Sequence, residues 1–138
     1  MATYNKFHNF VQDLAHKVHN LSTDQLKVAL TNTAPVASNS VLANLTGVLG
    51  TTNLLGATPF NITTVSAVQT NGIFELVVAD LLLTASGGSV GPFQYVVLYN
   101  DTAVNDPLIG WWVYTSPVTL ANGETFLIDV GANILTLG

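Results

Sequence analysis

Three histidines close to the N-terminus are the residues whose types and spacing could support metal or acid–base chemistry. His16 and His19 are three residues apart and would share one face of a helix, whereas His8 and His16 would not. With Asp13 three residues before His16, this pair offers the kinds of donor that zinc accepts. A short terminal helix rarely supplies the open coordination position and the shaped cavity of a catalytic zinc site. We therefore interpret the histidines as solvent-facing residues of a helix and predict no metal site.

A second group of possible ligands lies in the segment before Pro107. Asp101, Asn105 and Asp106 carry the oxygen atoms that calcium prefers. Their spacing does not match an EF-hand loop, which needs Gly at its sixth position and Glu at its twelfth. Asp and Asn are also common turn residues because their side chains bond to the nearby backbone. The sequence therefore favours a structural turn over a cation site.

Six acidic residues could in principle supply the carboxylate pair of a glycoside hydrolase. That chemistry needs two carboxyl groups about 5–9 Å apart, and nothing in the sequence brings two of them together. The chain has no cysteine, which excludes thiol nucleophiles and thiolate metal sites. We predict that the protein is not an enzyme and binds no cofactor. The six residues are Glu75, Asp80, Asp101, Asp106, Glu124 and Asp129.

The adjacent residues Trp111 and Trp112 suggest a different activity, carbohydrate binding. Aromatic rings can stack on sugars, and three tyrosines occur nearby in the sequence. Adjacent residues of a strand face opposite sides, so only one of the two indoles can join any one surface. The sequence favours one indole in the core and the other at a rim or an intersubunit contact. A carbohydrate-binding module is kept as an alternative.

The N-terminal segment has the pattern of an amphipathic helix, which we predict over residues 5–19. Its apolar residues follow steps of three and four, the spacing of one helical face. We predict a single domain, in which residues 1–21 form an N-terminal helix or arm and residues 22–138 form the β-sandwich domain. The apolar face of the arm and the tryptophan pair are the candidate interface. These residues are Phe7, Phe10, Val11, Leu14, Trp111 and Trp112.

The rest of the chain has the signals of a mainly β protein. Asn71-Gly72 predicts a tight hairpin turn between strands at 62–68 and 73–84. Residues 31–60 are rich in Thr, Asn, Ser and Gly, which predicts a loop with a short helical turn at 40–45. The whole pattern predicts an antiparallel β-sandwich, either a jelly roll or an immunoglobulin-like fold. Further strands are expected at residues 26–30, 93–99, 108–114, 124–130 and 133–137.

Charge is scarce in this chain and unevenly placed. Charged residues make up 8% of the 138 residues, against about 25% in an ordinary globular protein, and the net charge is −5. This deficit predicts that another protein covers part of the surface. An acidic chain with three Lys and no Arg is a poor ligand for nucleic acid. No apolar run is long enough to span a membrane, and no export signal is recognisable.

All the lysines and histidines lie within the first 27 residues. Residues 28–138 contain six acids and no base. The arm could therefore dock on an acidic surface of a neighbouring copy or of a partner. If so, deleting residues 1–20 should leave the sandwich folded and weaken assembly.

Two stretches of the chain, one near each end, contain short sequence motifs. Residues 4–35 contain His-Asn-Leu at 19–21, followed by Asp-Gln-Leu-Lys-Val-Ala-Leu at 24–30. Residues 93–138 contain Tyr-Val-Val-Leu-Tyr-Asn-Asp-Thr at 95–102, Pro-Leu-Ile-Gly at 107–110 and an apolar end at 133–137. Together these motifs resemble a family of small virion proteins of tailed bacteriophages. The resemblance covers both ends of the chain and is weak for residues 36–92.

The resemblance implies a β-sandwich accessory protein of the virion with no catalytic residues. Its expected role is a capsid decoration, or cement, protein that binds the major capsid protein on the outside of the shell. The expected assembly is a homo-oligomer, with a trimer favoured, made in the cytoplasm of the bacterial host. A tail, neck or fibre-base component of the virion is the alternative within the same family.

Overall fold

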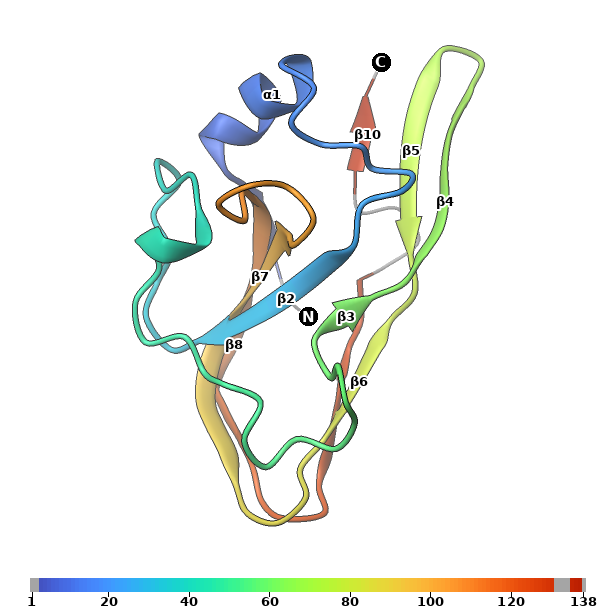
Figure 1. Cartoon of the computed structure of the whole chain (residues 1–138). Coiled ribbons are helices and arrows are strands. Elements are labelled where there is room, and N and C mark those ends of the chain that lie inside the picture. Colours follow the sequence, from blue (N-terminus) through green and yellow to red (C-terminus); the bar gives the residue numbers. More distant parts are fainter. Residues whose placement is uncertain (1–2, 131–134, 138) are drawn as a thin grey trace.

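The computed structural model describes residues 3–130 and 135–137 of the chain. It is mainly β, with antiparallel sheets and one short N-terminal helix, which confirms the fold class predicted from the sequence at this level. Figure 1 shows the helix at one end of the molecule and the turns after β6 and β8 at the other. The elements are β1 Thr3–Lys6, α1 His8–Ala15, β2 Leu26–Thr31, the 3-10 helix η1 Leu42–Asn44, β3 Asn61–Ile62, β4 Thr64–Thr70, β5 Ile73–Val78, β6 Leu81–Thr84, β7 Val90–Asn100, β8 Leu108–Leu120, β9 Thr125–Ile128 and β10 Leu135–Leu137.

The largest sheet has five strands in the order β1-β8-β7-β2-β3. Its central strands are the apolar and aromatic runs of the sequence, which are typical of strands covered on both faces. Val97 of β7 lies opposite Ala29 of β2 on one side and opposite Trp111 of β8 on the other. The strands β7 and β8 are longer than predicted, since both continue past the aromatic runs to residues 90 and 120.

Two smaller sheets complete the fold, one of three strands in the order β10-β5-β4 and one formed by β6 and β9. The predicted hairpin between β4 and β5 is confirmed, and Asn71 and Gly72 both have the positive φ that a type I′ turn requires. The predicted strand at 73–84 is divided into β5 and β6 by Ala79 and Asp80. Of the predicted strand at 133–137, residues 133 and 134 lie outside the described residues, and the remainder is β10.

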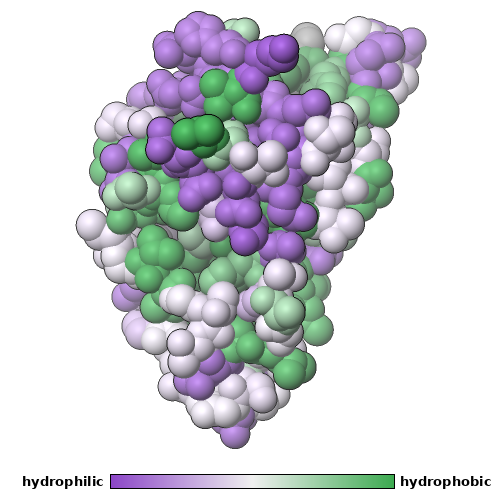
Figure 2. All heavy atoms as spheres, in the orientation of Figure 1, coloured by the Kyte–Doolittle hydropathy of each residue, from purple (hydrophilic) through white to green (hydrophobic). Residues whose placement is uncertain are grey.

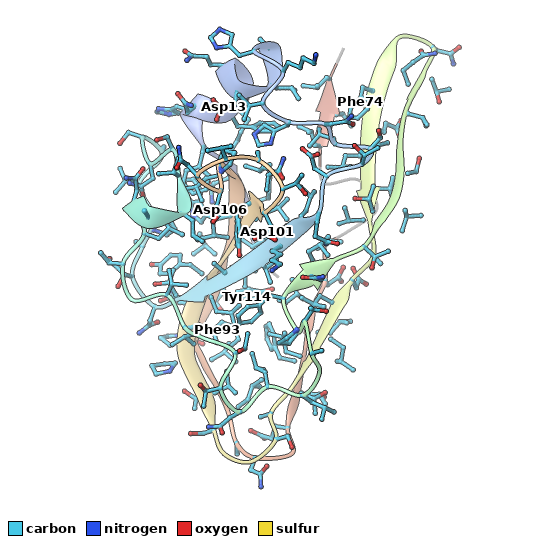
Figure 3. The ribbon with its side chains drawn as sticks, viewed as in Figure 1. Asp13, Phe74, Phe93, Asp101, Asp106 and Tyr114 are labelled. Carbon is cyan, nitrogen blue, oxygen red and sulfur yellow. The ribbon has the colours of Figure 1, made fainter. Side chains whose placement is uncertain are left out.

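The main core cluster contains buried residues from all three sheets. Examples are Val96 of the five-stranded sheet, Leu76 of the three-stranded sheet and Leu83 of the two-stranded sheet. Figure 3 labels Phe93 of β7 and Tyr114 of β8, whose rings each meet the ring of Phe126 in β9 edge-on. The five-stranded sheet therefore packs against the smaller sheets through apolar and aromatic side chains.

The opposite face of the five-stranded sheet carries a second core cluster. Its buried members include Val97, Leu108 and Trp111, and it is covered by residues from the segment after β2. The covering residues Ala37, Leu42 and Leu45 come from the stretch that the sequence predicts to be a loop. The five-stranded sheet is thus covered on both of its faces.

The N-terminal segment differs from its prediction. The helix predicted at 5–19 is wrong at both ends, because residues 3–6 form β1 and the helix ends at Ala15. β1 pairs with β8 along Thr3↔Val113 to Lys6↔Gly110, and this pairing removes the first turn of the expected helix. Lys17, just after the helix, has a positive φ of 66°, a conformation in which a helix does not continue. Phe10 and Leu21 belong to the main core cluster, so residues 3–21 pack as part of the same core as the sheets.

Candidate functional site

Four of the six candidate interface residues are buried inside the chain. Phe7 and Phe10 have no exposed surface, and Trp111 and Trp112 are 9% and 4% exposed. Contrary to the sequence-based prediction, these four side chains are not available to a partner in the folded chain. Of the other two, Val11 is 48% exposed and Leu14 is partly buried against the main core. The apolar face of the helix is turned toward the core because the helix covers one end of the sheets (Figure 1).

The tryptophan pair does face opposite sides of β8, as the alternation predicts. Trp111 contacts the Phe7 ring, with centroids 4.5 Å apart, in the second cluster. Trp112 contacts the Tyr4 ring, with centroids 5.1 Å apart, and belongs to the main core. The prediction that one indole lies at a rim is wrong, since the segment after β2 covers the second face of the sheet. With both indoles buried, the pair offers no platform for stacking sugars.

A groove of about 490 Å³ lies between the segment after α1 and the sheet formed by β4, β5 and β10. Ala67, Phe74 and Leu137 line it from the sheet, and Figure 3 labels Phe74 on β5. Leu14, Val18 and Leu21 add apolar surface from the other side. The polar residues along the groove are Lys17, His19, Asn20, Ser22 and Asp24.

Beside this groove, a buried polar network determines which ring nitrogen of His19 carries the proton in the neutral form. Asn100 is fully buried, and its Oδ1 accepts hydrogen bonds from the backbone N–H groups of Thr102 and Ala103 at 2.9 and 3.1 Å. Its Nδ2 must therefore be the donor to Asp24 Oδ2 at 2.7 Å and to His19 Nδ1 at 3.0 Å. His19 Nδ1 accepts, so the neutral ring carries its proton on Nε2, which is buried and has no hydrogen-bond partner among residues 3–130 and 135–137.

The surroundings of His19 oppose its protonation. Burial lowers the pKa of His19, and the nearby carboxylates of Asp13 and Asp24 offset part of this effect. The side chain is 6% exposed and packs on the Phe10 ring, with centroids 5.2 Å apart. The prediction that all three histidines face solvent is therefore wrong for His19, which joins the segment after α1 to the end of β7.

Acidification should weaken the fold through this histidine. The folded state holds the His19 pKa below the value of about 6.5 expected for the unfolded chain, so the unfolded chain takes up its proton first as the pH falls. The free energy of unfolding should therefore be highest above about pH 7 and decrease as the pH falls below about 6.5. Urea titrations at several pH values should show this decrease in the free energy of unfolding. In the His19→Gln variant the decrease between pH 7 and 5 should be smaller than in the parent chain. His16→Gln, at an exposed histidine, is the matched control, and its free energy of unfolding should depend on pH as in the parent chain. An unaltered pH dependence in the His19 variant would contradict the role given to this residue.

Asp101, Asn105 and Asp106, the possible calcium ligands, lie in a turn that contains an ion pair, in line with the structural turn that the sequence favours. Asp101 and Asp106 lie on the connection between β7 and β8 (Figure 3), where Asp101 Oδ2 is 3.3 Å from Lys27 Nζ. Burial raises the pKa of Asp106, Asp101 raises it further, and Lys27 opposes both effects. The backbone carbonyl of Asp106 accepts a hydrogen bond from Leu42, so the turn also anchors η1.

One catalytic pattern was missed at the sequence level. Residues 87–91 read Gly-Gly-Ser-Val-Gly, which has the G-x-S-x-G spacing of a hydrolase nucleophile. That motif works on a sharp turn between a strand and a helix, whereas here residues 87–89 lie in the connection between β6 and β7, and residues 90 and 91 begin β7. The turn lies at the end of the molecule opposite α1 (Figure 1), while all three histidines lie in residues 8–19. Ser89 is therefore far from a general base of the histidine type.

Within residues 3–130 and 135–137, no group of three or more histidine, aspartate or glutamate side chains is placed to hold a metal ion. No helix in the same part of the chain is both long and apolar enough to cross a membrane. Comparison of the chain with protein-family models, curated proteins and solved structures finds no match.

Proposed function

We propose that this chain is a non-enzymatic structural protein of a bacteriophage virion. Its proposed role is that of a capsid decoration protein, which binds the major capsid protein on the outside of the shell and stabilises the particle. We also propose that the five-stranded sheet and the smaller sheets pack as a β-sandwich of the jelly-roll or immunoglobulin-like type. The resemblance of residues 4–35 and 93–138 to small virion proteins supports the biological setting.

The observation that carries this proposal is an apolar surface with very few charges. Eleven charged residues are spread over 7069 Å² of accessible surface, which is about one per 640 Å². That area matches the largest apolar patch on an ordinary monomer. Large apolar side chains are exposed in many places, from Val18 at 36% to Val104 at 85%. In Figure 2, hydrophilic residues gather around α1, and hydrophobic residues are scattered along the sides of the molecule among residues of intermediate hydropathy.

A decoration protein would stabilise the shell by burying part of this surface against it, and this effect needs no catalysis. A standard interface buries about 1,600 Å² in total. A protein that binds the assembled shell and not its separated subunits shifts the equilibrium toward the shell. Many identical sites around a capsid would multiply this effect. The proposed assembly is a homo-oligomer, with the trimer as the form that the family resemblance favours.

Adding the purified chain to phage particles that lack it tests this role. We expect saturable binding in sedimentation, and particles that release their DNA at a higher temperature once the chain is bound. The matched control is the same chain after heat denaturation, which should not bind. Particles that neither bind the folded chain nor gain heat resistance would contradict a decoration role.

A further inference from the structure

Two turns of this protein contain an asparagine followed by a glycine, and this pair is open to a spontaneous chemical change. Asparagine is one of the thermolabile residues, and a following glycine has no side chain to obstruct the attack of its backbone nitrogen on the asparagine. The two pairs are Asn71-Gly72, between β4 and β5, and Asn122-Gly123, between β8 and β9. All four residues are exposed, so exposure alone does not distinguish the two turns.

The reaction is deamidation, and water is its only co-reactant. The glycine nitrogen bonds to the side-chain carbon Cγ of the asparagine and gives up its proton, and the side-chain nitrogen leaves with that proton as ammonia. Water then adds to one of the two carbonyl groups of the cyclic imide and breaks its bond to nitrogen. One opening gives aspartate, and the other gives isoaspartate, in which the main chain runs through the former side chain. Either product carries a carboxylate where a neutral amide stood.

Hydrogen bonds hold both reacting groups of the Asn122-Gly123 pair. The attacking nitrogen is that of Gly123, and its N–H donates to the carbonyl of Ala85 at 2.7 Å. Ala85 is a buried member of the main core cluster, so this acceptor is fixed in place. The side chain to be attacked is held as well, since Asn122 Oδ1 accepts from the Gly87 N–H at 2.9 Å. Both groups are thereby tied to the turn after β6.

The Asn71-Gly72 pair is held more weakly. The Gly72 N–H donates to Gln69 Oε1 at 3.0 Å, and Gln69 is an exposed residue of β4, so water competes for this bond. Among residues 3–130 and 135–137, none forms a hydrogen bond with the Asn71 side chain. The pair lies at the tip of the hairpin formed by β4 and β5 (Figure 1). The side-chain carbonyl of Asn71 can therefore turn toward the Gly72 nitrogen once a single exposed bond opens.

We propose that Asn71 is a site of spontaneous deamidation in the folded protein and that the fold protects Asn122. The product adds one negative charge to a chain whose net charge is −5. Isoaspartate also lengthens the main chain, so a two-residue turn that contains it cannot keep Thr70 directly opposite Ile73. The change at Asn71 occurs whether or not the chain is part of a virion. In a particle whose proteins are not renewed, the product would accumulate with age.

The test is peptide mapping by mass spectrometry of the parent chain during incubation at mildly alkaline pH, once folded and once unfolded in guanidinium chloride. In the folded chain, Asn71 should be converted at least about fivefold faster than Asn122, since one more hydrogen bond of ordinary strength must break at Asn122. In the unfolded chain the two asparagines should be converted at similar rates, because both precede glycine and neither is held. Enzymatic methylation of isoaspartate should label the folded chain at position 71.

Two matched variants assign the new charge to its position. Asn71→Gly removes the amide and suits the positive φ of this position, so the variant should fold and lose most of the acidic product that ion-exchange chromatography separates. Asn122→Gly is the control and should accumulate acidic product at the rate of the parent chain. If Asn71→Gly does not fold, the peptide map of the parent chain still decides the question.

Three results would overturn the proposal. The first is conversion of Asn122 as fast as that of Asn71 in the folded chain. The second is a folded chain in which Asn71 stays intact while the unfolded chain is converted at both positions. The third is acidic product that forms in a folded Asn71→Gly variant at the rate of the parent chain.

Discussion

Deleting residues 1–20 should unfold the protein, in contrast to the behaviour expected of a detachable arm. The deletion removes β1, which pairs with β8, and it removes the fully buried rings of Phe7 and Phe10. Truncation of one buried Phe to Ala costs about 3–5 kcal/mol. Two such losses reach about 6–10 kcal/mol, which is most or all of the 5–15 kcal/mol that stabilises a typical domain. The deletion also removes His19, which bonds to Asn100.

Circular dichroism, thermal melting and the fluorescence emission of Trp111 and Trp112 would measure the loss of folding. We expect no cooperative melting transition and a red-shifted tryptophan emission, because both indoles lose neighbours from the deleted segment. A milder variant, Phe10→Ala, should remain folded with a lower melting temperature, and Val11→Ala at an exposed position of the same helix is its control. A truncated chain with the melting temperature of the full chain would show that residues 1–20 are a detachable arm after all.

Val97→Asp should also abolish folding. Val97 has no exposed surface, lies at the centre of the five-stranded sheet and belongs to the second core cluster. Its neighbours across the sheet, Ala29 and Trp111, cannot neutralise a carboxylate. A buried charge without a partner costs several kcal/mol, and here the packing of the valine is lost in addition. The combined cost is comparable with the whole stability of a domain of this size.

Val104→Asp is the matched control for this variant, because it makes the same substitution at a side chain that is 85% exposed. We expect it to melt within a few degrees of the parent chain, while Val97→Asp is recovered unfolded or aggregated. The free energies of unfolding from urea titration would give the same comparison. A soluble Val97→Asp chain with an unchanged melting temperature would contradict the assignment of both faces of this sheet to the core.

The parts of the fold that depend on local chemistry could be predicted from the sequence. Asn71 and Gly72 both accept a positive φ at low cost, so the turn between β4 and β5 is encoded by two adjacent residues. The apolar and aromatic runs that form β2, β7 and β8 were likewise clear, because β-branched and aromatic residues are enriched in strands. The ends of β7 and β8 were missed since they consist of residues such as Gly91, Pro92 and Pro117, which weaken a strand signal but are tolerated in the folded sheet.

Contacts between distant segments account for the errors. The spacing of Phe7 and Phe10 fits a helix, yet residues 3–6 pair with a strand more than one hundred residues later, which no local pattern shows. Trp111 is buried, in addition to Trp112, because the segment after β2 places three apolar residues, Ala37, Leu42 and Leu45, over its face of the sheet. These residues are too few and too irregularly spaced to predict a cover for the sheet.

The candidate site was harder to predict than the fold for the same reason. His19 was placed on a helical face, but the helix ends four residues earlier and the ring is buried against Asn100. A buried asparagine at the end of a strand was the available signal for this network, and it can be recognised only once the strand is known.

The most direct test of a capsid decoration role is the number of copies of this chain in purified phage particles. Quantitative mass spectrometry against labelled peptides, with the major capsid protein as the internal reference, would measure it. We expect hundreds of copies per particle, in a fixed ratio to the major capsid protein. A dozen copies or fewer would place the chain in the neck or tail and contradict decoration of the shell. Its absence from the particle would contradict the virion role itself.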